Sequence, residues 1–455
     1  MFFLRVVTGF ISLATVLVLG ATVGAQSLTQ TLINAYNKNP TLLAARAKLR
    51  ATDEGVSQAI SNWRPKITLS GSYGLKRSDS TVNGPVSKSA DVTVPATGSL
   101  QIVQNLYRGG RTTAAIEKAE NDVLADRASL AKTEQTILLS AIIAYADVVR
   151  DQAVLKLNKN NQIVLARQLE ATRDRFKVGE VTKTDVSLAE SRLSRAKADK
   201  ILAEGNLTDA RATYENVVGL VPGTLKAALA RVELPENIDE AVRLAKKNNY
   251  DVIQRGFKES SARNSIRKTK GELLPTISVN GSASAKNETA GDRSQSESVA
   301  ISVEVSIPLY ASGSVVSRVR EAKQLAAQRR DEHQQSVRDA IEEVTEAWQS
   351  LKTRKAQSNA FSDAVNASEI ALDGVKEEAN VGSRTILDVL DAEQELLDAR
   401  VSLVRVKRDE LVASFEVKKA IGELTAEKLN LPVKLYDVKK YYKNTRNKWW
   451  GLSVN

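Results

Sequence analysis

The chain contains two copies of one pattern, and this internal duplication constrains the fold more than any other sequence feature. Residues 28–39 resemble residues 238–249, and the match continues to Pro65 and Pro275 at a constant offset of 210 residues. Further along, the offset falls to 203 residues. The later matches are Leu106, Tyr107 and Gly110 with Leu309, Tyr310 and Gly313, and Val178, Gly179, Thr182, Asp185 and Val186 with Val381, Gly382, Thr385, Asp388 and Val389. Similarity on this scale indicates two structural repeats with one plan.

The change of offset falls in a polar stretch rich in Gly, Ser and Asp between Ile67 and Leu106, and we interpret it as a difference in loop length. The predicted division of the mature chain is a first repeat in residues 26–219, a linker in 220–237, a second repeat in 238–422 and a basic tail in 423–455.

The amino terminus has the pattern of a secretory signal peptide, predicted to span residues 1–25. Arg5 precedes an apolar run over residues 6–23, and the small pair Gly24 and Ala25 follows it. The apolar run is close to the ~18 residues that cross a bilayer, so an uncleaved anchor helix is the alternative. Either interpretation predicts that the chain is exported.

Each repeat is predicted to have the order helix, strand, strand, helix, helix. Residues 28–62 and 238–273 have helical periodicity, and Pro65 and Pro275 then begin extended segments. Apolar or small residues alternate there with polar ones, which indicates strands of roughly ten residues. The alternating positions are Ile67, Leu69, Gly71, Tyr73 and Leu75; Gly98, Leu100 and Ile102; Ile277, Val279, Gly281 and Ala283; and Val299, Ile301, Val303, Val305 and Ile307.

This alternation is typical of a membrane barrel, although a soluble sandwich shows it too. Trp63 before the first strand, with Tyr107 and Tyr310 after the second strand of each repeat, favours the membrane because aromatic residues concentrate at its interfaces. Four strands cannot close a barrel, since about eight are needed. We therefore predict an α+β membrane protein whose homotrimer forms a 12-stranded β-barrel.

Long helical patterns follow the strands. Two of about 67 residues cover 112–178 and 315–380, and two of about 37 residues cover 183–219 and 385–421. At ~1.5 Å per residue the longer ones reach on the order of 100 Å, too long for a globular core. Many of their residues are Ala, which favours close coiled-coil packing. The lengths predict two short helices end to end beside each long helix, and a trimer of such units forms an α-helical cylinder.

Composition excludes most enzyme classes. The chain has no Cys and one His, His333, so thiol chemistry, zinc clusters and His-dependent triads are not expected, and no cofactor or metal is predicted. Adjacent carboxylates such as Glu342 and Glu343 lie in charged helices, where they are typical of a solvated face. The net charge is +11, but basic and acidic residues interleave, so a nucleic-acid partner is not predicted.

The two Gly-x-x-Thr-x-x-Asp-Val turns, the duplicated element order and the segment 382–391 resemble the TolC family of outer-membrane efflux and secretion channels. The resemblance covers about residues 28–422, and it suggests that the tail 423–455 packs around the equator of the cylinder, with a frayed tail as the alternative. It implies a homotrimer in the outer membrane of a Gram-negative bacterium, with a large periplasmic portion contacted by a periplasmic adaptor protein and an inner-membrane RND or ABC pump. The implied function is the exit duct for drug efflux or type I protein secretion. The alternative from another class is a periplasmic coiled-coil adaptor or scaffold without channel activity.

The turns have a predicted structural role, because each Gly suits a helix C-terminus and each Thr is placed to cap the next helix. The resemblance implies that the turns also contact the adaptor. The residues predicted for that contact are Val178, Gly179 and Thr182 in the first turn and Val381, Gly382 and Thr385 in the second.

Two further clusters are predicted beside the turns. By resemblance, Arg384 pairs with Thr184 and Asp185 across neighbouring coiled coils and closes the periplasmic end, although Ala379 stands where the family usually has a tyrosine. Asp388 and Asp391 are three residues apart and share one helix face. In a trimer they predict an acidic ring at the constriction, with cation selectivity.

Overall fold

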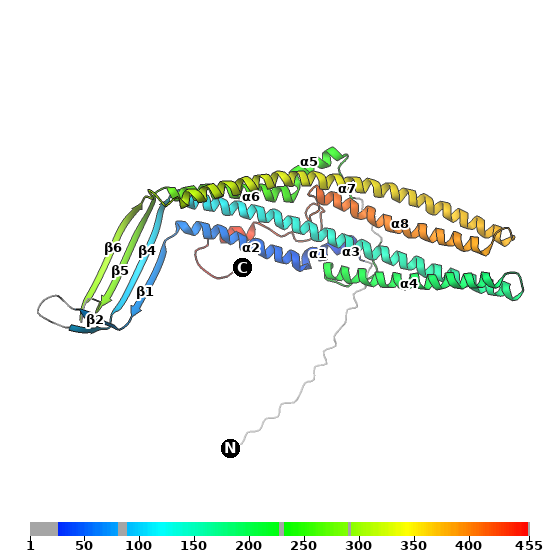
Figure 1. Cartoon of the computed structure of the whole chain (residues 1–455), viewed down its shortest axis with the longest axis horizontal. Helices are drawn as coiled ribbons and strands as arrows, with labels where there is room; N and C mark the ends of the chain where they lie inside the picture. Colours follow the sequence, from blue (N-terminus) through cyan, green and yellow to red (C-terminus); the bar gives the residue numbers. More distant parts are fainter. Residues whose placement is uncertain (1–25, 81–88, 227–231, 290–292, 454–455) are drawn as a thin grey trace, which may run out of the picture.

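The computed structural model describes residues 26–80, 89–226, 232–289 and 293–453, and the predicted signal peptide lies outside these ranges. The molecule is elongated, with a four-stranded sheet at one end and two paired-helix tips at the other (Figure 1). None of the helices in the described ranges combines the length and the apolar character needed to cross a lipid bilayer.

The two halves of the chain contain the same helices in the same order, so the predicted duplication is confirmed. The first half contains α1 (Leu28–Lys38), α2 (Pro40–Ile60), α3 (Arg111–Lys177) and α4 (Lys183–Val218). The second half contains α5 (Ile238–Asn248), α6 (Tyr250–Lys270), α7 (Ser314–Asn380) and α8 (Ile386–Ala420). The helices α3 and α7 each have 67 residues, as their sequence patterns predict.

The first helix of each repeat is broken, which differs from the continuous helices expected over 28–62 and 238–273. The break lies at Asn39, whose side-chain oxygen accepts hydrogen bonds from the amides of Thr41 (3.0 Å) and Leu42 (3.3 Å). Pro40 begins α2 at a position where its missing N–H costs nothing. Asn249 caps α6 in the same way.

The same two asparagines join the short helices end to end. The side-chain amide of Asn39 donates to the carbonyl of Val217 at the end of α4 (2.9 Å), and that of Asn249 donates to the carbonyl of Ala420 at the end of α8 (3.3 Å). Each asparagine thus satisfies one helix start and one helix end. The predicted columns, α4 with α2 beside α3 and α8 with α6 beside α7, follow from these joints (Figure 1).

The sheet is antiparallel, with the strand order β1 (Lys66–Tyr73), β4 (Ala96–Arg108), β5 (Thr276–Asn287) and β6 (Gln295–Ser306). Its register aligns the apolar residues of all four strands on one face and small polar residues on the other. Two apolar rows are Ile67, Ile102, Gly281 and Ile301, and Leu69, Leu100, Ala283 and Val299, whereas Ser70, Ser99, Ser284 and Ser298 form a polar row. The predicted alternation is therefore seen across both repeats.

Two features of the strand region were not predicted. The polar stretch interpreted as a loop contains a separate hairpin, β2 (Lys76–Ser80) with β3 (Ser89–Thr93). A β-bulge between Asn105 and Tyr107 shifts the register, so that Tyr107 pairs with Ile277 on the apolar side. Simple alternation from Ile102 would place Tyr107 on the polar face.

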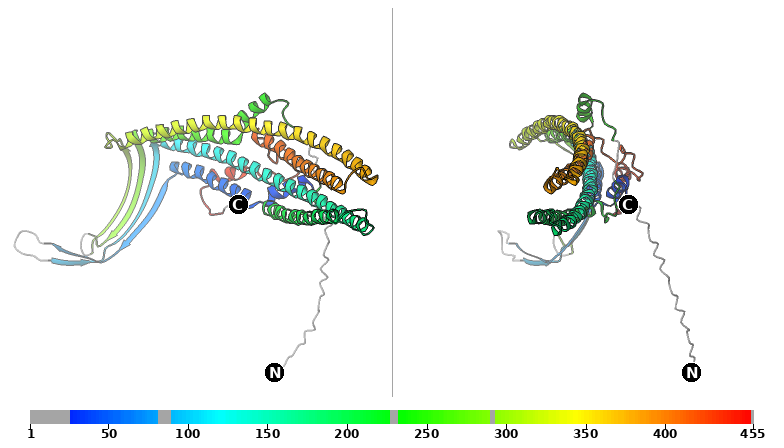
Figure 2. Two further views of the ribbon diagram at one scale, coloured as in Figure 1. Left: turned by 45° about the vertical axis from the view of Figure 1, so that its right-hand side comes forward. Right: turned by 90° about the vertical axis from the view of Figure 1, so that its right-hand side faces the viewer.

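The middle of the molecule contains its main apolar core. Leu138, Ile142 and Tyr145 of α3 pack there with Tyr214 of α4 and Leu424 of the tail. The tail continues past α8 along α2 and includes the short helix α9 (Lys440–Thr445). Viewed along the long axis, the helices form an arc with a concave side (Figure 2).

Candidate functional site

The tips of the two helical hairpins are built alike. In the first turn the amide of Glu180 donates to the carbonyl of Arg175 (2.9 Å), and Gly179 has a φ of +83°. In the second turn the amide of Ser383 donates to the carbonyl of Glu378 (2.9 Å), and Gly382 has a φ of +79°. Both turns are thus glycine-terminated helix ends, for which a left-handed residue is required.

A capping box begins the helix after each turn. The amide of Thr182 donates to the Asp185 carboxylate (2.9 Å), while the amide of Asp185 donates to the Thr182 hydroxyl (3.3 Å). Thr385 and Asp388 make the same pair of bonds at 2.9 and 3.2 Å. Reciprocal capping satisfies two of the free amides of a helix start, which explains why Thr and Asp recur three residues apart.

The outer surface of the tips exposes apolar side chains. Val178 is 72% exposed and Val381 is 80% exposed, and each lies directly before the turn glycine. Each turn therefore exposes one valine beside the capped helix start, and the turns lie at the end of the molecule opposite the sheet (Figure 1).

Arg384 does not contact its predicted partners within the chain. Its Nε donates to the Glu378 carboxylate (2.8 Å), and both side chains are about half exposed. The hydrogen bond that it donates to Glu378 and the charges of Glu378 and Asp388 raise the pKa of the Arg384 guanidinium. Asp185 is used in the first capping box, and a single chain does not bring Thr184 and Asp185 to Arg384.

The two acidic residues of the predicted ring have different surroundings. Asp388 is the cap partner of Thr385, whose amide and hydroxyl lower the pKa of the Asp388 carboxyl. Asp391 instead accepts a hydrogen bond from Arg192 of α4 at 2.5 Å. Asp391 thus has an ion-pair partner inside the same chain, and Asp388 has the Arg384 charge nearby.

An apolar cluster lies beside this ion pair. Leu390 of α8 is buried with Leu165 of α3 and Ala196 of α4, and Leu188 packs against them. Leu188 occupies the repeat position equivalent to Asp391, which explains why the first repeat has an apolar residue there. The tips of the two hairpins are therefore joined by one apolar cluster and one ion pair.

A second ionic link joins the repeats nearer the middle of the molecule. Arg408 of α8 donates to Asp147 of α3 (2.8 Å), and Arg150 contacts both Asp147 (2.8 Å) and Asp151 (2.7 Å). Asp151 is buried and the other three side chains are partly buried, as is Arg192 at the tip, whereas Asp391 is 56% exposed. The hairpins are therefore held by a shielded charge cluster in the middle and a solvated pair at the tip.

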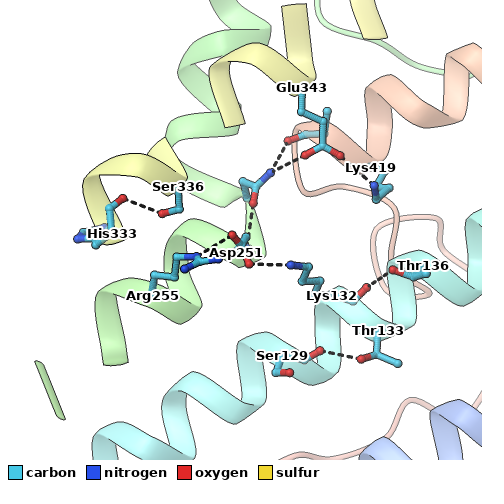
Figure 3. Close-up of polar contacts among 12 residues, drawn as sticks. Ser129, Lys132, Thr133, Thr136, Asp251, Arg255, His333, Ser336, Glu343 and Lys419 are labelled. Atoms are coloured by element: carbon cyan, nitrogen blue, oxygen red, sulfur yellow. Dashed lines mark hydrogen bonds and ion pairs between the residues drawn. The ribbon is translucent and has the colours of Figure 1, made fainter. Parts of the chain in front are cut away.

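The joint between α8 and α6 is also polar (Figure 3). Asp251 in the first turn of α6 contacts Lys132 of α3 (2.6 Å) and Arg255 (3.0 Å), and Lys419 of α8 contacts Glu343 of α7 (2.9 Å). Burial opposes ionisation of Asp251, but the hydrogen bonds from Lys132 and Arg255 outweigh it and lower the pKa of its carboxyl. These ion pairs connect α6 with α3 of the first repeat, and α8 with α7.

Sequence reasoning did not find Arg192 or Glu378. Arg192 lies far from Asp391 in sequence, and its role depends on how α4 approaches α8, for which the sequence carries no local signal. Glu378 is an acidic residue near a helix end, where pattern alone predicts only a solvated side chain.

This architecture, with an amphipathic four-stranded sheet continued by long paired helices and capped helical tips, defines the protomer of an outer-membrane channel. The chain belongs to the outer membrane efflux protein family, whose model matches residues 32–220 and 241–423. The two matched segments correspond to the two repeats. Its relatives are channels rather than enzymes, and they place this chain in the outer membrane of a Gram-negative bacterium with its helical part in the periplasm.

Individual relatives agree with this assignment. The chain is 35% identical over 432 residues to the outer membrane efflux protein BepC of Brucella suis, covering 94% of this chain and 92% of that protein. It is 26% identical to the outer membrane protein TolC of Vibrio cholerae, covering 90% and 93%. The crystal structure of the Campylobacter jejuni CmeC outer membrane channel superimposes with a TM-score of 0.78 at 16% identity, covering 92% of this chain and 89% of that one.

Proposed function

We propose that three copies of this chain assemble into an exit duct that carries substrates from an inner-membrane pump, through the periplasm, to the exterior. The observation that carries the proposal is the open sheet. Its order ends in β1 on one side and β6 on the other, and unpaired strand edges in a membrane are costly. Pairing β6 of one copy with β1 of the next leaves no edge and gives twelve strands.

The helical half supports the same assembly. Its arc is concave on one side (Figure 2), so three arcs side by side enclose a cylinder in line with the barrel. The shielded Asp147–Arg408 contact keeps the two hairpins of each copy together in the middle, which leaves the tips as the movable end.

We assign adaptor contact to the six tips of the trimer. Val178, Gly179 and Thr182, with Val381, Gly382 and Thr385, form two matching surfaces that suit a repeated helical partner. The protein is then one part of a three-part assembly with a periplasmic adaptor and an RND or ABC pump. Among its relatives, BepC is named an efflux protein, and PrtF of Dickeya chrysanthemi, 25% identical over 303 residues, is named a proteases secretion protein.

The proposed latch at the closed end pairs Arg384 of one copy with Thr184 and Asp185 of its neighbour. The exposed Arg384–Glu378 contact supports an exchange of partners, because surface ion pairs contribute only about 0 to 1 kcal/mol. Arg192–Asp391 is a second ionic link near the tips, within one copy.

The proposed acidic constriction consists of Asp388 and Asp391 from three copies. Carboxylates around a pore axis favour cations. Arg192 offsets the charge of Asp391 in the closed arrangement, so Asp388 contributes more of the field there.

The test is electrical recording from the purified protein in planar bilayers, combined with its migration in detergent gels. We expect a trimer that resists dissociation on mild heating and that produces discrete conductance steps. A soluble monomer without conductance would contradict the duct and support the periplasmic scaffold instead.

A further inference from the structure

The carboxyl-terminal tail follows α2 toward the sheet. Contacts between the two segments advance together along both sequences. The Tyr441 hydroxyl donates to Glu54 (2.7 Å), the Ser57 hydroxyl donates to the carbonyl of Thr445 (2.7 Å), and Arg64 donates to the carbonyl of Lys448 (2.7 Å). The tail therefore runs alongside α2 as far as Arg64, shortly before β1, and then turns back on itself (Figure 1).

The tail is fixed along this path. The hydrogen bond to Glu54 and burial raise the pKa of Tyr441 to about 12, so the phenol remains a donor at physiological pH. Thr445 of α9 is buried, and Arg446 contacts Glu120 of α3 (2.9 Å). The position of the last residues is thus set by several independent contacts on α2 and α3.

The end of the tail exposes large apolar side chains beside the membrane-facing strands. The Arg64 guanidinium lies over the Trp449 ring, with 4.8 Å between the guanidinium carbon and the centroid of the ring. The Lys448 ammonium donates to the carbonyl of Ser453 (2.9 Å). Beyond Trp449, the side chain of Trp450 is 85% exposed and that of Leu452 is fully exposed. Two residues after Arg64, Lys66 begins the strand whose Ile67 and Leu69 lie on the apolar face of the sheet.

The charge of the tail identifies the surface that it fits. Residues 434–453 contain six basic residues and one acidic residue, and Lys439, Lys440 and Lys443 are exposed. An anionic surface complements this segment. Trp beside Lys and Arg is the combination that favours the headgroup region of a bilayer.

We propose that residues 439–453 form a membrane-interface anchor, in which Trp450 and Leu452 insert into the periplasmic leaflet of the outer membrane while the neighbouring lysines bind anionic phospholipid headgroups. The anchor is distinct from the strands because it attaches the helical half, through α2, to the membrane surface. It would resist tilting of α2 relative to the sheet.

The chain has no native Cys, so a single Leu452→Cys substitution allows unique spin labelling of the full-length protein with all four Trp retained. The labelled protein is reconstituted in vesicles of phosphatidylethanolamine and phosphatidylglycerol. Collisions of the label with oxygen, which concentrates in lipid, are compared with collisions with a water-soluble nickel chelate. We expect high oxygen and low nickel accessibility at position 452.

The matched control is Leu435→Cys, an exposed position on the same tail far from the strands, where we expect the nickel chelate to dominate. Adding Trp450→Ser to Leu452→Cys should return the label to water, and replacing phosphatidylglycerol by phosphatidylcholine should weaken its insertion. A label at 452 that collides freely with nickel would overturn the proposal, as would one shielded from both reagents, because a neighbouring subunit would then cover it.

Discussion

Asp251 shows how one side chain stabilises the joint between stacked helices. It lies in the first turn of α6, where a carboxylate also interacts favourably with the helix dipole. We expect Asp251→Asn to lower the free energy of unfolding by about 1 to 2 kcal/mol at pH 7.

The difference in the free energy of unfolding between the Asp251→Asn variant and the unsubstituted protein should decrease as the pH falls. The folded-state pKa of Asp251 lies below its ordinary value of 3.8, so the carboxylate stabilises the fold above about pH 4 and this contribution is lost as the pH falls through the folded pKa. Thermal unfolding of the unsubstituted protein and of the Asp251→Asn variant between pH 3 and 7 measures this loss of stability. A difference that is the same at both ends of this range would contradict the charge-based explanation.

Arg192 makes the acidic constriction testable at single-residue level. If it offsets Asp391, Arg192→Gln should strengthen block by the trivalent cation hexamminecobalt, because the freed carboxylates attract it. Asp388→Ala with Asp391→Ala should abolish the block and reduce cation selectivity. The control is Arg195→Gln, which removes an exposed charge on the same helix near Asp199. Equal block in the Arg192 and Arg195 variants would argue against the assigned pair.

At the scale of elements, substitutions in the turns can distinguish the structural role of the turn glycines from their proposed role in adaptor contact. A β-carbon at Gly382 meets no atom within 4 Å, and Asn tolerates the left-handed backbone that this position requires. We therefore expect Gly382→Asn, and equally Gly179→Asn, to leave trimers intact but to reduce export strongly, because the added side chain occupies the adaptor contact.

The control is Gly374→Asn, an exposed glycine in α7 where a β-carbon also meets no atom within 4 Å. Export is measured in cells and trimers in detergent gels. Normal export by both turn variants would remove the turns from the adaptor contact.

The elements themselves differ in how far the sequence predicts them. Apolar alternation and the long helical periods predicted the four-stranded sheet and α3, α4, α7 and α8, since each pattern reflects one local period. The break at Asn39 had a usable signal, an asparagine cap followed by proline, which the continuous helical period obscured. The β2–β3 hairpin had only a weak signal, because the sequence of β2 is entirely polar and that of β3, Ser-Ala-Asp-Val-Thr, alternates over only five residues.

Some features of the candidate site could likewise be predicted from the sequence, and others could not. The caps at Thr182 and Thr385 were predicted because capping is local. The contacts of Asp391 with Arg192 and of Arg384 with Glu378 depend on helix packing and side-chain conformation, which a single sequence does not specify.

For the whole molecule, the proposed latch predicts that the channel opens by separation of the tips while the middle stays closed. We expect Arg384→Ser with Asp185→Asn to increase single-channel conductance, because the latch charges are lost while asparagine can still cap α4. Glu378→Gln removes only the partner of Arg384 within the chain and should leave conductance unchanged. If Glu378→Gln opens the channel as much as the double variant, closure depends on the contact within one chain rather than on the latch between copies.

The pairing of β4 with β5 also sets an order of events during biogenesis. These neighbours in the sheet are separated in the chain by all of α3 and α4 and by the start of the second repeat. Helical hairpins form from local contacts and therefore fold quickly, whereas pairings between distant segments are slow. Until β5 pairs with β4, the antiparallel pair of β1 and β4 lacks its neighbour in the sheet. The apolar face of this pair is then exposed to aggregation, so the joining of the two repeats is a vulnerable step in the folding of this topology.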